Sequence, residues 1–470
     1  MNLKNRLGIC VGPFSNVKQG KFVRYGPNRL NTNTVAGIKD IYAQGKNVRK
    51  SKTYSAMVHQ ALNTLTISDP KEHGRRRRVI SQGFSDSAMR NYEPSMMVII
   101  QRFCDSLLQA SEEEKAGSLA SWKPARNMSQ WCSYFAFDIM SDLIFGGKYN
   151  LLEKPTYRYV PGVIETSNVR ISALLQAPTL RYGRLDKALF PKSIAARNVF
   201  VRFVGRILRD TLKVDRTGKK DFFAVLSSAK DPETGSGFTQ EEIIAESTTL
   251  IVAGMSADTV ATATTALFFY LSRNPGAYVR ATTEIRQTFS SIEDVCMGPK
   301  LNSCKYLRAC VDETMRMSPS VGSSLFREVQ KGGAMVDGEF IPAGCDVGTP
   351  IYSIQHSAEY FSNPFTFSPE RWIVGESGAT QESVALASSA YVPFSSGPRG
   401  CVGKGMALTE MMLTMAVVLY RLDFKIAEGD SAGGKPDAEW GRHRPNEFQL
   451  KDHVTAARDG PVLHFRERAI

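Results

Sequence analysis

The feature that most constrains the fold is a long segment without a helix breaker, residues 239–274. Thr239 and Glu242 have the spacing of a capping box, and acidic residues in the first turn suit the positive end of the helix dipole. Nothing interrupts the pattern before Pro275, so the segment predicts a helix of roughly 50 Å. Its middle, residues 250–271 (LIVAGMSADTVATATTALFFYL), is apolar nearly all round, which is typical of a buried helix. The sequence therefore predicts a mainly helical protein with one central buried helix.

The remaining patterns add further helices and small pieces of β-structure. Apolar residues spaced three and four apart predict helices over residues 92–108, 131–145, 195–214 and about 403–422. Short alternating segments broken by Gly and Pro predict hairpins over residues 22–34 and 332–344. Because 470 residues are too many for one ordinary core, we expect two lobes or one large domain, mainly α with small β-sheets.

Composition and charge exclude several classes of protein. With 42% hydrophobic and 22% charged residues, the chain is neither disordered, nor a collagen, nor a repetitive fibre. The net charge of +13 is concentrated at the N-terminus, since residues 1–80 contain 16 Lys and Arg but three acidic residues. In the remainder of the chain, the number of Lys and Arg residues equals the number of Asp and Glu residues. The basic excess is therefore a property of the N-terminal region.

Cysteine spacing and hydropathy exclude further classes. The eight cysteines form no CxxC pair, which fits neither a disulfide scaffold nor a structural zinc module. No stretch contains the ~18–20 consecutive apolar residues needed to cross a bilayer, and the first residues are too polar for a signal peptide. We therefore expect a soluble or peripheral protein in which residues 1–20 are an atypical N-terminal extension without a membrane anchor.

The most specific chemical signal is the string FSSGPRGCVG, residues 394–403, which opens the last predicted helix. Unsatisfied backbone N–H groups and the positive helix end at this place stabilise a thiolate at Cys401, and Arg399 adds a cation. Such a thiolate is a soft anionic ligand that suits iron. The alternative is a buried free cysteine in a glycine-rich loop. A phosphate loop is excluded because Pro398 stands where such a loop needs glycine.

This string resembles the haem-binding loop of the cytochrome P-450 superfamily, the haem-thiolate monooxygenases. Other elements follow in the family's order. Glu313 to Arg316 is similar to its E-x-x-R helix, residues 367–372 (FSPERW) to its F-x-P-E-R-W segment, and residues 73–77 (HGRRR) to its H/W-x-x-x-R element. The long helix is similar to the family's oxygen-activating helix. The likeness covers residues 20–466.

The resemblance implies a role for each matching residue. Cys401 would be the iron ligand, in a loop shaped by Phe394, Gly397 and Gly403. The two carboxylates of haem b would be held by cations, namely His73, Arg77, Arg327 and Arg399. A buried network would support the loop, formed by Glu313, Arg316 and Arg371.

Two of these groups have plainer interpretations when read without the resemblance. Glu313 and Arg316 are i,i+3 neighbours, which by themselves form a modest surface pair. The run Arg75–Arg78 is typical of a solvated face or of a nucleic-acid patch. Because the run has no interleaved aromatic residues and no nucleic-acid-binding motif appears, we expect no nucleic-acid partner.

Asp258 and Thr259 are similar to the family's acid–alcohol pair, which the resemblance implies relays protons to bound oxygen. The spacing departs from the family pattern, since two extra residues separate Gly254 from Asp258. Either Ser256 takes the place of the glycine or the helix bulges there. The alternative role for Thr259 is a hydroxyl bonded back to its own helix backbone.

Taken together, the resemblance predicts a haem-thiolate fold over residues 21–470, with a large helical lobe and a smaller β-containing lobe. The expected activity is insertion of one atom of O2 into a small lipophilic substrate, as in fungal microsomal enzymes of secondary metabolism. Electrons would come from an NADPH-dependent flavoprotein reductase or a cytochrome b-type donor. The resemblance implies a location at the endoplasmic reticulum surface, and because no segment can span a membrane, we expect a peripheral or a cytosolic protein. The alternatives are a haem-thiolate isomerase, dehydratase or peroxygenase, or a non-catalytic haem-binding product of a truncated gene.

Overall fold

The computed structural model describes residues 21–58, 61–109, 122–146, 149–213, 221–252 and 258–468. The predicted N-terminal extension, residues 1–20, lies outside the described residues, as does the stretch 253–257 that contains Gly254 and Ser256. Within the described residues, no helix combines the length and the hydropathy needed to cross a membrane.

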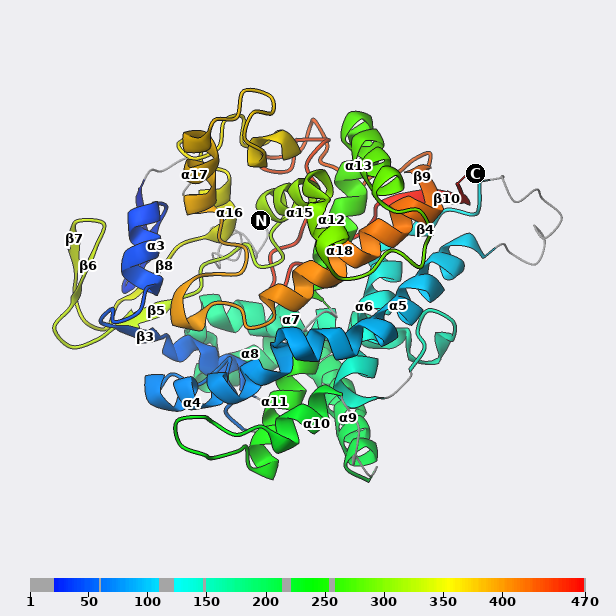
Figure 1. The fold of residues 1–470 in the computed structure, drawn as a ribbon. Coiled ribbons are helices and arrows are strands. Elements are labelled where there is room, and N and C mark those ends of the chain that lie inside the picture. Colours follow the sequence, from blue (N-terminus) through cyan, green and yellow to red (C-terminus); the bar gives the residue numbers. More distant parts are fainter. Residues whose placement is uncertain are drawn as a thin grey trace.

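Helices make up most of the protein (Figure 1). The longer ones are α4 (Pro70–Ser81), α5 (Asp86–Leu108), α6 (Met128–Phe145), α7 (Tyr159–Gln176), α9 (Pro191–Lys213), α11 (Gln240–Val252), α12 (Thr259–Arg273), α13 (Pro275–Thr288), α15 (Lys305–Met317), α17 (Gln381–Ala390) and α18 (Lys404–Arg421). The shorter ones are α3 (Val35–Tyr42), α8 (Leu185–Leu189), α10 (Phe222–Ser228), α14 (Pro299–Ser303) and α16 (Ile351–Gln355). Single 3-10 turns include η1 (Lys52–Met57), η2 (Gln82–Phe84), η6 (Pro369–Trp372) and η7 (Gly397–Arg399).

The central helix is α12, in which every residue from Val260 to Leu271 is buried. It packs against α6, α13, α15 and α18 in the main hydrophobic core. This agrees with the apolar pattern of the sequence, because a helix that is apolar all round is stable only when other helices cover all its faces.

The strands form three small sheets. The largest has the order β1 (Phe22–Gly26), β2 (Arg29–Thr32), β8 (Asp346–Gly348), β5 (Arg327–Val329), β3 (Val48–Lys50), in which β2 and β8 run parallel and the other pairs antiparallel. A second sheet joins β4 (Arg126–Asn127), β10 (Val462–Glu467) and β9 (Leu422–Ile426). The third is the hairpin of β6 (Ala334–Val336) and β7 (Glu339–Ile341).

A second hydrophobic core lies where α3 and α17 pack with the largest sheet, and it includes Ile38, Val329, Val347 and Ala387. The predicted mainly α class and the division into a helical part and a smaller β-containing part are therefore confirmed. The predicted hairpins and the four predicted helices are also present, with ends that differ by a few residues.

The prediction of one unbroken helix over residues 239–274 falls in part on residues 253–257, outside the described residues, and at Asp258 the structure has a helix start where the prediction had a helix interior. Thr239 and Glu242 do form the predicted capping box, since each backbone N–H donates to the other's side chain at 2.9 and 3.2 Å. Helix α11 is described as far as Val252, and helix α12 begins at Thr259, with Asp258 at its N-cap position. The carboxylate of Asp258 is bound by side chains of the C-terminal segment, a tertiary contact that periodicity does not reveal.

Candidate active site

A cavity of about 360 Å³ lies beneath the N-terminal end of α12. Its walls come from η1, α4, α7, α11, α12 and the loop that precedes α18, and its side chains are mainly apolar, among them Ile80, Leu250, Val260, Ala263 and Phe394. A site of this composition suits a lipophilic ligand with a few polar contacts.

Cys401 lies on the wall of this cavity, at the end of a tightly bonded loop. The Cys401 N–H donates to the Phe394 carbonyl at 2.8 Å, and the Gly400 N–H donates to the Gly397 carbonyl at 2.9 Å. Gly397 has φ +67°, and a Cβ there would lie 1.9 Å from the Tyr42 carbonyl oxygen, so only glycine fits. The loop therefore presents the sulfur in one orientation.

The surroundings of the Cys401 sulfur act on its protonation in opposite directions. Burial raises the pKa of the thiol, whereas the Gly403 N–H and the charges of Arg77 and Lys404 lower it. The net effect is that the pKa of the Cys401 thiol is raised above its usual value. A bound metal ion would reverse it, because coordination deprotonates a thiol outright.

Positive side chains gather along one side of the cavity. Arg77 donates to the Gly400 carbonyl at 2.5 Å, and Arg399 donates to the carbonyls of Ile67 and Ser68 at 2.5 and 3.1 Å. His73 is 5% exposed, and burial together with the neighbouring cations lowers its pKa to about 3, so it is neutral at pH 7.

Lys50 also lines the cavity, although sequence reasoning did not identify it. Arg327, which was identified, lies directly opposite Lys50 in the antiparallel pair of β3 and β5 and is not one of the residues that line the cavity. Nothing in the local sequence marks Lys50, because its position depends on which strand pairs with β3.

The charges around the cavity show whether the residues present fit haem. Within the described residues, none of Lys50, Arg77, Arg327 and Arg399 forms an ion pair with a carboxylate. Lys50 and Arg327 are buried and Arg77 and Arg399 are half-buried, and because buried cations without counterions are costly, the site suits an anion from outside the chain. Haem b carries two carboxylates and an iron that takes a thiolate ligand, and the residues present therefore fit it.

Glu313 is the centre of a buried network behind the Cys401 loop. Both of its oxygens accept from Arg316 at 2.8 Å, and Oε1 also accepts from Arg371 Nε at 3.0 Å. Trp372, which the sequence analysis did not assign, donates its indole N–H to Oε2 at 3.0 Å. Burial opposes ionisation of Glu313, but the arginines outweigh it and hold its pKa below the usual value.

The guanidinium of Arg316 links this network to the backbone, since it also donates to the carbonyls of Gln355 and Pro364 at 2.8 and 2.7 Å. Glu313 and Arg316 are both fully buried, so the interpretation as a surface pair does not apply.

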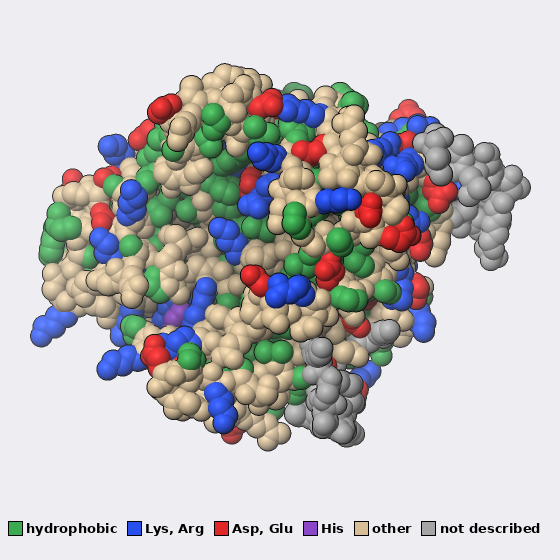
Figure 2. Space-filling view, in the orientation of Figure 1, with side chains coloured by type: hydrophobic (Ala, Val, Ile, Leu, Met, Phe, Trp, Pro, Cys, Tyr) green, Lys and Arg blue, Asp and Glu red, His purple; other side chains and the backbone are tan. Residues whose placement is uncertain are grey.

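The run Arg75–Arg78 is not a solvated basic face. Arg75 and Arg76 form ion pairs with Glu72 and Glu242, and Arg78 pairs with Asp231. On the face shown in Figure 2, Lys and Arg side chains are interspersed with Asp and Glu rather than gathered into one patch.

Asp258 and Thr259 occupy different surroundings. Thr259 lines the cavity, whereas Asp258 does not, because its carboxylate accepts from Thr455 and from Arg458. Thr455 itself lines the cavity, so its hydroxyl connects Asp258 with the space where a ligand binds. Neither Thr455 nor Arg458 belongs to a motif that could have identified it from sequence.

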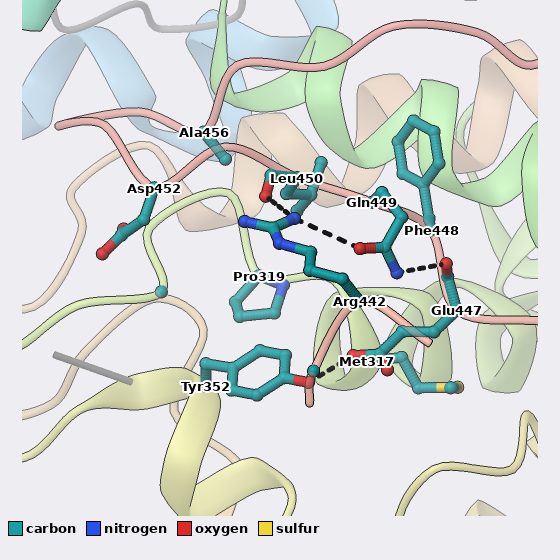
Figure 3. A pocket seen from close by; sticks show the side chains of 12 residues that line it. Met317, Pro319, Tyr352, Arg442, Glu447, Phe448, Gln449, Leu450, Asp452 and Ala456 are labelled. Carbon is teal, nitrogen blue, oxygen red and sulfur yellow. Dashed lines mark hydrogen bonds between the residues drawn. The ribbon is translucent and has the colours of Figure 1, made fainter. Parts of the chain in front are cut away.

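The segment that carries Thr455 is held in place next to a smaller cavity of about 50 Å³ (Figure 3). Arg442 donates to the Leu450 carbonyl at 2.6 Å and to Gln449 Oε1 at 3.2 Å, and Tyr352 donates to Glu447. These bonds tie the C-terminal segment to itself and to α16, and so fix the wall of the large cavity.

Comparison with known proteins agrees with this geometry. The family model of cytochrome P-450 matches residues 19–447. The chain is 45% identical over 455 residues to the cytochrome P-450 monooxygenase AKT7 of Alternaria alternata, covering 96% of this chain and 86% of that protein. It is 45% identical over 456 residues to the cytochrome P-450 monooxygenase atnE of Emericella nidulans, with the same shares covered.

Among solved structures, the haem domain of a cytochrome P-450 shares the fold with a TM-score of 0.71 at 16% sequence identity, over 95% of this chain and 88% of that chain. The chain therefore belongs to the cytochrome P-450 family and is a haem-dependent oxidoreductase of the monooxygenase type.

Proposed function

We propose that this protein inserts one atom of O2 into a small lipophilic substrate of fungal secondary metabolism, with electrons from an NADPH-dependent flavoprotein reductase or a cytochrome b-type donor. The observation that carries the proposal is the position of Cys401 on the wall of an apolar cavity whose cations lack counterions. The relatives in Alternaria alternata and Emericella nidulans support the fungal setting. In this proposal residues 21–470 act as one catalytic domain.

Bound haem supplies the redox chemistry, and the residues of this chain have distinct tasks around it. Cys401 provides the thiolate ligand, and the loop with Phe394, Gly397 and Gly403 orients it. Arg77, Arg399 and His73 bind the haem carboxylates, with Arg327 near His73 and Arg399. Charge-assisted hydrogen bonds of this kind are about twice as strong as neutral ones.

Protons would reach the cavity through hydroxyl groups. Thr259 lines the cavity and is placed to order a water molecule there. The carboxylate of Asp258 pairs with Arg458, and the Thr455 hydroxyl, which donates to that carboxylate, belongs to a residue of the cavity wall. The apolar walls exclude bulk water from the same space.

Reconstitution tests the proposal. The haem-loaded protein is mixed with a flavoprotein reductase, NADPH and candidate lipophilic compounds, and oxygen uptake and oxygenated product are measured. Uptake that requires both the reductase and a compound is the expected result. Conversion without a reductase, driven by peroxide or without any electron donor, would instead identify a peroxygenase, isomerase or dehydratase.

We further propose peripheral attachment to the endoplasmic reticulum surface through the basic N-terminal region. Basic residues near an anionic leaflet contribute around 1 kcal/mol each, and this attraction is screened by salt. Fractionation against a salt series should release at least part of the protein from membranes. Retention through both high salt and alkaline carbonate would contradict peripheral attachment.

A further inference from the structure

Glu246, in α11, is an acidic residue on the wall of the large cavity, and no other Asp or Glu lines that cavity among the residues that the structure describes. Its side chain is 1% exposed. A carboxylate in a mainly apolar wall is costly unless partners compensate its charge. The partners of Glu246 therefore decide what this part of the cavity can bind.

The partners that the chain provides all lie at one carboxyl oxygen of Glu246. The Thr64 N–H and the Thr64 hydroxyl both donate to Oε1 at 2.8 Å, and Arg76 Nη1 donates to the same oxygen at 3.4 Å. Within the described part of the chain, Oε2 accepts no hydrogen bond. An ionised carboxylate accepts at both oxygens, so Oε2 is left for a ligand.

The arginines next to Glu246 are shared with two other carboxylates. Arg76 lies nearer to those two, at 2.7 Å from Glu72 and 3.1 Å from Glu242, than its 3.4 Å from Oε1. Arg75 pairs with the same two carboxylates. Three carboxylates thus share two guanidiniums, which leaves one negative charge in excess. Glu246, the most buried of the three, has the longest ion-pair distance.

The face of α11 that meets the cavity presents a second hydrogen-bond acceptor. Thr249 and Leu250 follow Glu246 by three and four positions, and all three residues line the cavity. The Thr249 hydroxyl donates to the Ala245 carbonyl at 2.8 Å, so its oxygen can accept a hydrogen bond but has no proton left to donate. This face therefore suits a ligand group that carries hydrogen-bond donors.

The charge of that ligand group follows from the electrostatics of Glu246. Burial raises its pKa above the usual value, because the hydrogen bonds from Thr64 and the charge of Arg76 compensate the buried carboxylate only in part. A cation next to Oε2 would supply the missing compensation, whereas an anion would be repelled.

We propose that Glu246 determines substrate specificity by binding a cationic nitrogen group, such as a protonated amine or a guanidinium, on a lipophilic substrate. The inference rests on the proposed function, because it names the class of substrate for that same cavity. The hydrocarbon part of such a compound would lie against the apolar walls, which include Leu65, Ile171 and Leu250.

The first measurement compares two probes on the haem-loaded, unmodified protein. Dodecylguanidinium and dodecylurea have the same chain and nearly the same shape, but only the first is charged at pH 7. Each is titrated while the spin state of the haem iron is followed by absorbance. Dodecylguanidinium should bind about tenfold more tightly, because a planar guanidinium forms charge-assisted hydrogen bonds to a carboxylate.

The second measurement assigns this preference to one residue. Glu246→Gln removes the charge but keeps an oxygen that accepts from Thr64. We expect it to lose about tenfold in affinity for dodecylguanidinium and to bind dodecylurea as before. Thr249→Val should weaken dodecylguanidinium binding by a smaller factor. Should Glu246→Gln fail to fold by far-ultraviolet circular dichroism, Thr249→Val and the preference of the unmodified protein still test the inference.

Glu241→Gln is the matched control. Glu241 lies in the first turn of the same helix, is exposed and does not line the cavity. The substitution removes the same charge from the same helix. The affinities for both probes should equal those of the unmodified protein.

Three results would overturn the inference. The unmodified protein would show no preference for dodecylguanidinium, or Glu246→Gln would leave both affinities unchanged, which would make Glu246 a residue that only ties Thr64 to α11. An equal loss for both probes in Glu246→Gln would show that Glu246 shapes the cavity without recognising charge.

The proposed function would fail in a different way. In that case the unmodified protein would hold haem but consume no oxygen with the reductase and any lipophilic compound. The probe titrations need neither the reductase nor oxygen, so they would still give their result.

Discussion

Arg458, near the C-terminus, forms an ion pair with Asp258 at the start of the central helix α12, with 3.1 Å between Nη1 and Oδ1. The arginine side chain is 4% exposed and also donates to Thr262 Oγ1 at 2.7 Å and to Ser133 Oγ at 2.8 Å. One guanidinium thus ties α12 to α6 and to the C-terminal segment.

We expect Arg458→Met to destabilise the protein by ~3–5 kcal/mol, because it leaves the largely buried carboxylate of Asp258 without its counterion. The midpoint of urea unfolding measures this. Lys46→Met is the control, since Lys46 pairs with Asp40 at an exposed site where removal should cost no more than about 1 kcal/mol. Equal midpoints for the two variants would mean that the Arg458 pair contributes nothing.

Thr259→Ala should leave haem binding and substrate affinity intact but uncouple NADPH oxidation from product formation. The ratio of product to NADPH consumed should fall by about tenfold or more, as expected when a positioned proton donor is lost. Hydrogen peroxide should account for the difference. An unchanged ratio would show that Thr259 is a structural residue of α12.

Thr455→Val tests whether Asp258 acts through the cavity-facing hydroxyl. Valine has nearly the same shape but cannot donate to Asp258, so the connection between the carboxylate and the cavity is lost. We expect the product ratio to fall as in Thr259→Ala, with little change in substrate affinity. Full coupling in Thr455→Val together with uncoupling in Thr259→Ala would assign the proton path to Thr259 alone.

Cys401→Ala should abolish the thiolate signature in the absorbance spectrum of the reduced carbon monoxide complex, because it removes the sulfur that faces the cavity. Cys345→Ala is the control, since Cys345 does not line the cavity and should be dispensable for the spectrum. Retention of the signature in Cys401→Ala would contradict the assignment of the iron ligand.

Glu410, in the middle of α18, gives a prediction about pH. It is fully buried, neither carboxyl oxygen has a hydrogen-bond partner among the described residues, and burial raises its pKa well above the usual value. The folded state therefore keeps the proton that the unfolded state releases above pH ~4.5. Stability from this group falls as pH rises, by at most about 1.4 kcal/mol per pH unit.

Glu410→Met removes this titration, so its gain in stability over the unmodified protein should grow between pH 5 and pH 8. Urea unfolding at both values measures the gain. The same stability difference at pH 5 and pH 8 would show that Glu410 is ionised in the folded protein.

Much of the site could be predicted from the sequence because its signals are local. The chemistry of Cys401 depends on the glycines and the helix start within a few residues of it, and the capping box of Thr239 depends on Glu242 three residues later. The apolar residues of α12 indicate a buried helix wherever it lies in the fold. Such features need no knowledge of distant parts of the chain.

Other features depend on pairs that are far apart in sequence, and the tertiary structure alone decides them. Lys50 lies on the cavity wall at a place set by the pairing of β3 with β5, in which it faces Arg327. Asp258 stands at the N-cap of α12, and its carboxylate is bound by Arg458, 200 residues later in the chain, and does not line the cavity. Periodicity and motif spacing record local propensity, whereas the direction of a buried charge is set by the partner that packing brings to it.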